Sequence, residues 1–133
     1  LPCCPHQAPK RLTIGADGNP WFSAMNYGHG TRGYQYFGTV AGGKAQLFRV
    51  SFKGLDHGAY ASGIASGVNG LYLTGGDPFN PDGGLWAIDA QRNQTVYDLP
   101  YNPIALALDA KGHPWLTAGW SGTPSQIVEV TLP

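Results

Sequence analysis

Short apolar runs, each bounded by glycine, proline or polar residues, recur along the whole chain and predict β-strands. In residues 104–108, Ile104, Leu106 and Leu108 alternate with two alanines, the period of two that is typical of a strand with one bulky and one small face. Asp17-Gly18 and Lys111-Gly112 supply the positive φ angle that a tight hairpin requires. The pattern therefore predicts an all-β chain of short strands joined by turns.

Three segments share one arrangement and indicate an internal repeat. Each has an apolar strand, a polar turn with glycine, an aromatic residue and then an apolar residue; the segments are residues 12–24, 63–75 and 104–118. The aromatic residues are Trp21, Tyr72 and Trp115, which lie 51 and 43 residues apart. Periods of roughly 40–50 residues with several strands each are typical of β-propeller blades. The small residues suit an innermost strand, and the recurrent aromatic is expected to fill the space between blades.

Further strands are expected after each aromatic strand. We predict third strands at residues 46–52, 85–89 and 126–130, with fourth strands at 95–100 and, in the first repeat, at 58–61. Residues 25–45 are expected to form a long loop. The repeats are placed at about 11–62, 63–101 and 102–133, after an N-terminal tail of residues 1–10 that is rich in proline and cysteine. A β-sandwich is the alternative architecture.

The order of an apolar strand, Asp17-Gly18-Asn19, Trp21-Phe22-Ser23 and a later apolar strand resembles the streptogramin-lyase-like and NHL-type propeller repeats. The resemblance covers residues 11–133 at the level of single blades and implies a propeller fold. The long segment after Phe22 departs from the compact blade of that family. A lyase activity would need a histidine base and acidic metal ligands, and no His-Glu pair adjoins His29, His57 or His113. The resemblance therefore assigns no catalytic residue here.

Three blades do not close a ring, because propellers have roughly four to eight. A segment of three would expose unpaired edges and apolar flanks, which favour association. We therefore expect other protein chains, identical or different, or the remainder of a larger propeller, to complete the ring. The sequence has no initiator methionine and no signal-like segment, so we expect a processed or excised piece.

Composition narrows the partners. Only 12% of the residues are charged, the formal net charge is zero, and Glu129 is the sole glutamate. Long solvated helices would need more charged residues on their outer faces. A phosphate-binding surface would need many more cations, so we expect no nucleic acid partner. No apolar run approaches the roughly 20 residues of a membrane helix, so we expect no membrane partner. No motif indicates a cofactor.

Two short features concern the location of the chain. Cys3 and Cys4 are adjacent, so they form a strained disulfide with each other, remain free thiols or bridge to another chain. Cys4 and His6 are too few ligands to indicate a metal site. Asn93-Gln94-Thr95 is a glycosylation sequon in a polar break between two strands, and it favours an extracellular or secreted protein.

Aromatic and polar residues on the predicted loops form the candidate binding surface. Such residues on loops over a rigid scaffold are typical of sugar or peptide binding, although they also anchor loops and subunit contacts. Asp77, Asn80 and Asp82 offer oxygen ligands for calcium, but their spacing matches no known calcium loop. The candidate ligand-binding residues are Tyr27, His29, Arg32, Tyr34, Tyr36, Asp77, Phe79, Asp82 and Trp120.

Together these patterns predict a non-enzymatic extracellular structural or interaction module, a β-propeller segment that assembles with other chains. One alternative is a carbohydrate-binding, lectin-like propeller that uses the aromatic long loops. Another is a fragment of a lyase-like propeller enzyme whose active groups lie outside the sequence.

Overall fold

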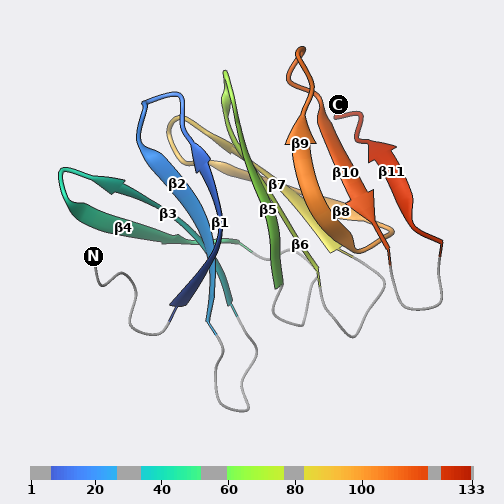
Figure 1. Ribbon diagram of the computed structural model, residues 1–133, viewed down its shortest axis with the longest axis horizontal. Helices are drawn as coiled ribbons and strands as arrows, with labels where there is room; N and C mark the ends of the chain where they lie inside the picture. Colours follow the sequence, from blue (N-terminus) through green and yellow to red (C-terminus); the bar gives the residue numbers. More distant parts are fainter. Residues whose placement is uncertain (1–6, 27–33, 52–59, 77–82, 120–123, 133) are drawn as a thin grey trace.

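The computed structural model describes residues 7–26, 34–51, 60–76, 83–119 and 124–132. All the regular secondary structure in these ranges is β-strand, which confirms the predicted all-β class (Figure 1). Because the described ranges contain no helix, they contain none that could cross a membrane.

The strands form three antiparallel sheets, and within each sheet every strand pairs with the next one along the chain. Sheet A contains β1 (Gln7–Ile14), β2 (Pro20–Asn26), β3 (Tyr34–Ala41) and β4 (Lys44–Arg49). Sheet B contains β5 (Tyr60–Gly67), β6 (Gly70–Gly76), β7 (Gly83–Asp89) and β8 (Gln94–Leu99). Sheet C contains β9 (Pro103–Leu108), β10 (Pro114–Ala118) and β11 (Gln126–Glu129).

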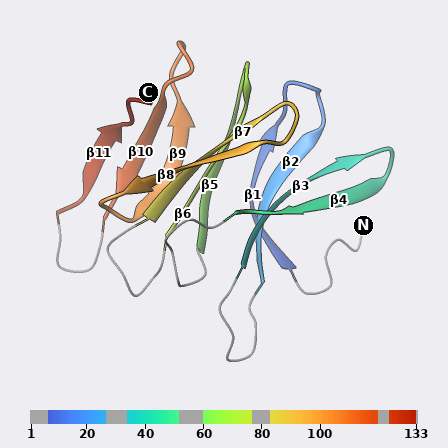
Figure 2. The ribbon, with the colours of Figure 1, turned by 180° about the vertical axis from the view of Figure 1, so that it is seen from behind.

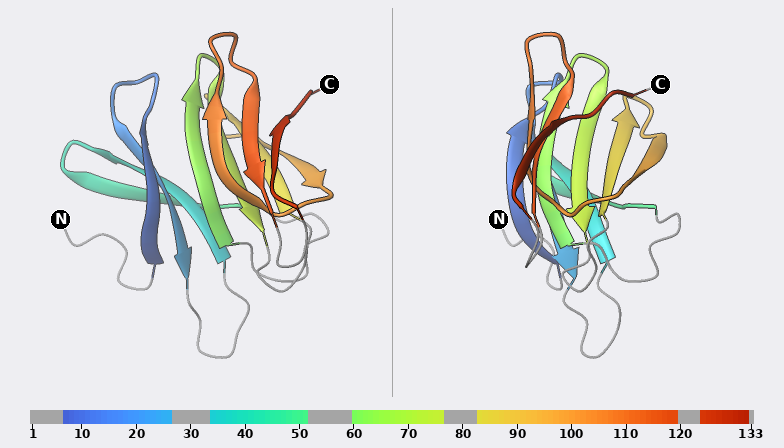
Figure 3. Two further views of the ribbon diagram at one scale, coloured as in Figure 1. Left: turned by 45° about the vertical axis from the view of Figure 1, so that its right-hand side comes forward. Right: turned by 90° about the vertical axis from the view of Figure 1, so that its right-hand side faces the viewer.

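The three sheets stand side by side, with sheet B in the middle (Figures 1 and 2). Their first strands are neighbours, since β1 lies beside β5 and β5 lies beside β9. From these strands the later strands of each sheet lead away (Figure 3). One apolar core lies between sheets A and B around Phe37, Leu73 and Trp86, and a second lies between sheets B and C around Leu85 and Leu116.

Three of the tight turns have the same backbone design, and two of them are the hairpins predicted from the sequence. In each turn the fourth residue has a positive φ angle: 78° at Gly18, 68° at Arg92 and 83° at Gly112. Two backbone hydrogen bonds close each turn, and the first residue takes part in both; the first residues are Gly15, Asp89 and Asp109. The turns at Gly18 and Gly112 join the first and second strands of sheets A and C, and the turn at Arg92 joins β7 to β8.

The prediction of one long loop over residues 25–45 is wrong in part. Residues 34–41 form β3, so the strand predicted at residues 46–52 is the fourth of its sheet, β4. Gly42 and Gly43, with φ angles of 58° and 75°, make the hairpin between them. The glycines and aromatics of this segment suggested a loop, yet its residues alternate between two faces as a strand requires. The fourth strand predicted at residues 58–61 is also wrong, because β5 begins at Tyr60 and opens sheet B.

One further boundary and the alternative architecture also differ from the structure. β1 begins at Gln7, inside the segment expected as a tail. The alternative of a β-sandwich requires two sheets, whereas the described residues form three.

Candidate interaction faces

The junction between sheets A and B fixes which faces of the sheets meet. On sheet A, the rings of Trp21, Phe37 and Phe48 stack on one another, with centroids 5.2–6.5 Å apart. They pack against a face of sheet B that carries Ile64 and Leu73. We name the face of each sheet that bears the recurrent aromatic the trailing face, and the opposite face the leading face.

The junction between sheets B and C repeats this arrangement. Tyr72 and Leu85 lie on the trailing face of sheet B, and they pack with Leu106 and Leu116 on the leading face of sheet C. In both junctions the trailing face of one sheet meets the leading face of the next. The recurrent aromatic of sheets A and B thus packs against the following sheet, as the sequence predicts.

The trailing face of sheet C is uncovered in the described chain. Three cross-strand pairs occupy the same place in their sheets: Ser23 with Phe37, Thr74 with Leu85, and Thr117 with Ile127. Phe37 and Leu85 are 0% exposed, whereas Ile127 is 77% exposed. Trp115, the equivalent of Trp21 and Tyr72, is also exposed.

At the opposite end of the stack, no sheet of the described residues covers the first strand of sheet A on its leading face, although Phe22 and Ala24 of β2 on the same face are buried. One residue in the first strand of each sheet has an equivalent cross-strand partner in the second strand. The pairs are Leu12 with Phe22, Ile64 with Leu73, and Leu106 with Leu116. Leu12 is 67% exposed, whereas Ile64 is 7% exposed. Ile14, which lies on the same face, is exposed as well. Exposed apolar residues that gather on one face mark interaction sites more often than scattered ones do.

A cleft of about 230 Å³ opens between sheets A and B at the end where the tight turns lie. Its lining includes Asp17, Trp21, Ser66, Asp89 and Arg92. Ser66 stands where sheet C has Leu108, so the A–B junction lacks the bulk that a leucine supplies at the B–C junction. The cleft is thus a place where the packing between two sheets is less complete.

Aspartates hold the three similar turns together. The backbone and side chain of Asn19 donate to Asp17 and lower the pKa of its carboxyl group, and Asn93 does the same to Asp89 through its side chain and backbone. The backbone N–H of His113 is the main cause of the lowered pKa of Asp109. The indoles of the recurrent aromatics also donate to these carboxylates; Trp21 Nε1 lies 3.1 Å from Asp17 Oδ1 and Trp115 Nε1 lies 3.2 Å from Asp109 Oδ2.

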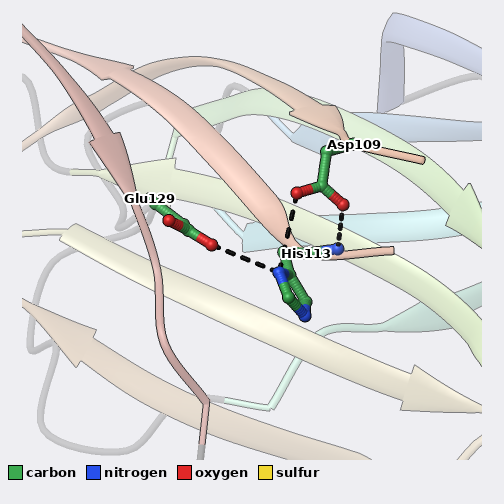
Figure 4. Close-up of side chains that lie close together, drawn as sticks. All are labelled: Asp109, His113 and Glu129. Atoms are coloured by element: carbon green, nitrogen blue, oxygen red, sulfur yellow. Dashed lines mark hydrogen bonds and ion pairs between the residues drawn. The ribbon is translucent and has the colours of Figure 1, made fainter. Parts of the chain in front are cut away.

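One group of side chains has the donor types of a metal site (Figure 4). His113 Nδ1 lies 3.2 Å from Glu129 Oε1 and 3.6 Å from Asp109 Oδ2. Both oxygens of Asp109 already accept hydrogen bonds, from the backbone N–H groups of Lys111 and His113 and from the indole of Trp115. Asp89 has the same role in its turn, where Asn93 stands in place of the histidine. The turn therefore explains Asp109 without a metal ion.

Most of the predicted binding residues lie outside the described ranges: Tyr27, His29, Arg32, Asp77, Phe79, Asp82 and Trp120, as do Cys3 and Cys4. Tyr34 lies in β3, and Tyr36, also in β3, is half-buried on the leading face of sheet A. Asn93 of the sequon is exposed beside the turn between β7 and β8, and its Nδ2 donates to Asp89 Oδ2 over 3.0 Å.

The residues that define the two uncovered faces were not among the predicted site residues. Leu12 and Trp115 belong to the repeat, but the sequence does not tell which face of a strand meets a neighbour. The sequence pattern hides the equivalence of Ile127 with Phe37, because it predicts a loop over the residues that form β3. With β3 placed, the alignment of the three sheets would have found this position.

No family model matches the chain, and no curated protein or solved structure shows significant similarity to it.

Proposed function

We propose that the chain is a non-enzymatic assembly module, a β-propeller segment of three blades that associates through its two uncovered faces. The observation that carries the proposal is the contrast at one repeated position. Phe37 and Leu85 are fully buried by the following sheet, whereas Ile127 has no following sheet among the described residues and is 77% exposed.

The order of the elements supports the propeller arrangement. Each sheet is an up-and-down meander, and the first strands β1, β5 and β9 lie next to one another. Successive antiparallel sheets around a common axis are the propeller design. Under this proposal a ring needs further sheets, and they would cover both faces at once.

Burial of apolar area drives the proposed association. Leu12, Ile14 and Ile127 expose large aliphatic side chains to water, and covering each one stabilises a complex by about 1.5–3 kcal/mol in the limit of full burial. The exposed position of Asn93 supports an extracellular site for the assembly, since glycosylation needs an accessible sequon.

Sedimentation velocity of Ile127→Asp against Val68→Asp tests the proposal. Both positions are exposed isoleucine or valine side chains, but Val68 lies in the turn between β5 and β6 and not on either uncovered face. We expect the wild type and Val68→Asp to associate and Ile127→Asp to be monomeric. A wild type that stays monomeric throughout the micromolar range would refute the proposal. Circular dichroism establishes that each variant is folded.

A further inference from the structure

We infer that the partner is a second copy of this chain, bound head to tail, so that two copies close one ring of six sheets. This inference rests on the proposed function. The trailing face of sheet C in each copy would pack on the leading face of sheet A in the other.

The molecule already contains two examples of the required contact. At the A–B and B–C junctions a trailing face meets a leading face, and the same strand positions take part each time. The free face of sheet C is a trailing face and the free face of sheet A is a leading face. Each copy thus offers both halves of a junction of the established kind, and the contact between copies would continue the stack.

The number of sheets favours two copies. Propellers close with roughly four to eight blades. Two copies of this sequence, with three sheets each among the described residues, make six, whereas three copies would exceed that range. Two copies related by a two-fold axis have two identical junctions, which leaves neither face uncovered. A head-to-tail contact that does not close would instead give open chains.

The B–C junction specifies which residues would meet between copies. A Cβ atom built on Gly63 would lie 2.7 Å from Leu106 Cβ, so β5 and β9 approach closely at this point. In sheet C, Ala105 pairs with Thr117 as Gly63 pairs with Thr74, and Leu12 is the counterpart of Leu106 in sheet A. We therefore place Ala105 of one copy against Leu12 of the other.

A second contact follows in the same way. A Cβ atom on Gly67 would lie 3.1 Å from Leu108 Cδ1 and 3.7 Å from Tyr72 Cε2, so Leu108 and Tyr72 approach the same point from two sheets. Their counterparts on the free faces are Ile14 and Trp115. The indole of Trp115 would then pack on Ile14 of the second copy, which covers two of the exposed apolar side chains.

Disulfide trapping tests this geometry in the full chain with Cys3 and Cys4 replaced by serine. One variant carries Ala105→Cys and another Leu12→Cys; a bridge requires Cβ atoms about 3.5–4.5 Å apart. Ala105 occupies in sheet C the place that Gly63 occupies in sheet B. A side chain at this place would hold β1 of the other copy slightly further away than β9 lies from β5 in the B–C junction. We expect covalent dimers when the two variants are mixed and oxidised, and none from either variant alone.

The outcomes separate this inference from the proposed function. Dimers from one variant alone would show a face-to-face contact and overturn the head-to-tail arrangement. A ladder of trimers and larger species from a variant with both cysteines would show an open chain and overturn the ring. Association by sedimentation without any cross-link would refute the second copy's placement but leave the assembly proposal standing. If the parent variant, in which serine replaces Cys3 and Cys4, stays monomeric, both the head-to-tail ring and the proposed assembly function are refuted.

Discussion

Phe37 and Ile127 occupy the same place in sheets A and C, and the first is fully buried whereas the second is largely exposed. Each side chain lies opposite a hydroxyl residue of the neighbouring strand, Ser23 or Thr117. The difference between them is therefore the presence of a following sheet among the described residues, and it marks the surface through which we propose that the chain associates.

Substitution of Phe37 tests the apolar junction between sheets A and B. Phe37→Ala should destabilise the fold by about 3–5 kcal/mol, because it removes a buried ring from the stack with Trp21 and Phe48. Urea denaturation at one fixed protein concentration measures the loss. Val68→Ala, at an exposed turn position, should change stability by less than about 0.5 kcal/mol. Equal losses in the two variants would contradict the assigned core.

Gly63 tests the close approach of β5 and β9. Gly63→Ala places a methyl group 2.7 Å from both Leu106 Cβ and Thr74 Oγ1, so the strands must move apart. We expect a loss of about 1–3 kcal/mol, the usual cost of overpacking. Gly119→Ala is the matched control, because its nearest contact would be 3.4 Å away. Thermal denaturation that leaves the Gly63 variant as stable as the Gly119 variant would refute the predicted crowding.

The turn aspartates predict how stability depends on pH. The carboxyl pKa values of Asp17, Asp89 and Asp109 lie below 3.8 in the folded chain, because N–H groups donate to the ionised forms. Their contribution is therefore complete above the unfolded pKa and is lost as the pH falls through the folded values. Denaturation midpoints should decline on acidification below about pH 4.

Asp89→Asn provides the control for this dependence. An asparagine still accepts backbone N–H bonds through its Oδ1 but carries no charge to titrate. The variant should show a shallower decline of the denaturation midpoint in acid than the wild type. An unchanged decline would mean that Asp89 does not contribute to it.

Two substitutions of Arg92 distinguish the effect of its backbone angle on stability from the effect of its side chain. It is the only residue other than glycine with a positive φ angle in the described ranges, and its guanidinium carbon lies 4.3 Å from the centroid of the Phe48 ring. Arg92→Ala and Arg92→Gly both lose this contact, but only glycine relieves the backbone. The glycine variant should be more stable than the alanine variant by about 1 kcal/mol in urea denaturation. The reverse order would contradict the turn geometry.

The sequence predicted much of the fold for identifiable reasons. The alternation at residues 104–108, the glycines at 18 and 112, and the recurrence of Trp21, Tyr72 and Trp115 all report local geometry, and the structure contains the strands and turns they indicate. The sequence does not predict β3, because only Gln35, Phe37 and Thr39 on one face carry its strand period, whereas the glycine-rich surroundings resemble a loop.

The candidate site was much harder to predict. Which side of a strand is covered depends on the neighbouring sheet. Ile127 and Phe37 are both large apolar residues in strands, so the sequence does not tell that one is exposed and the other buried. Residue type alone suggests the predicted loop residues, and most of them lie outside the described ranges. Only the register between strands places Leu12 on the leading face of sheet A and Ile127 on the trailing face of sheet C, the two faces that we propose meet between copies.

A complementation measurement tests the central claim, that sheets A and C carry matching halves of one junction. Leu12→Asp disables the leading face and Ile127→Asp disables the trailing face, so each variant alone should sediment at the monomer mass of 14.1 kDa. An equimolar mixture retains one intact junction per pair and should contain a species of twice that mass. A mixture that stays monomeric while the wild type associates, or either variant associating alone as the wild type does, would contradict the account.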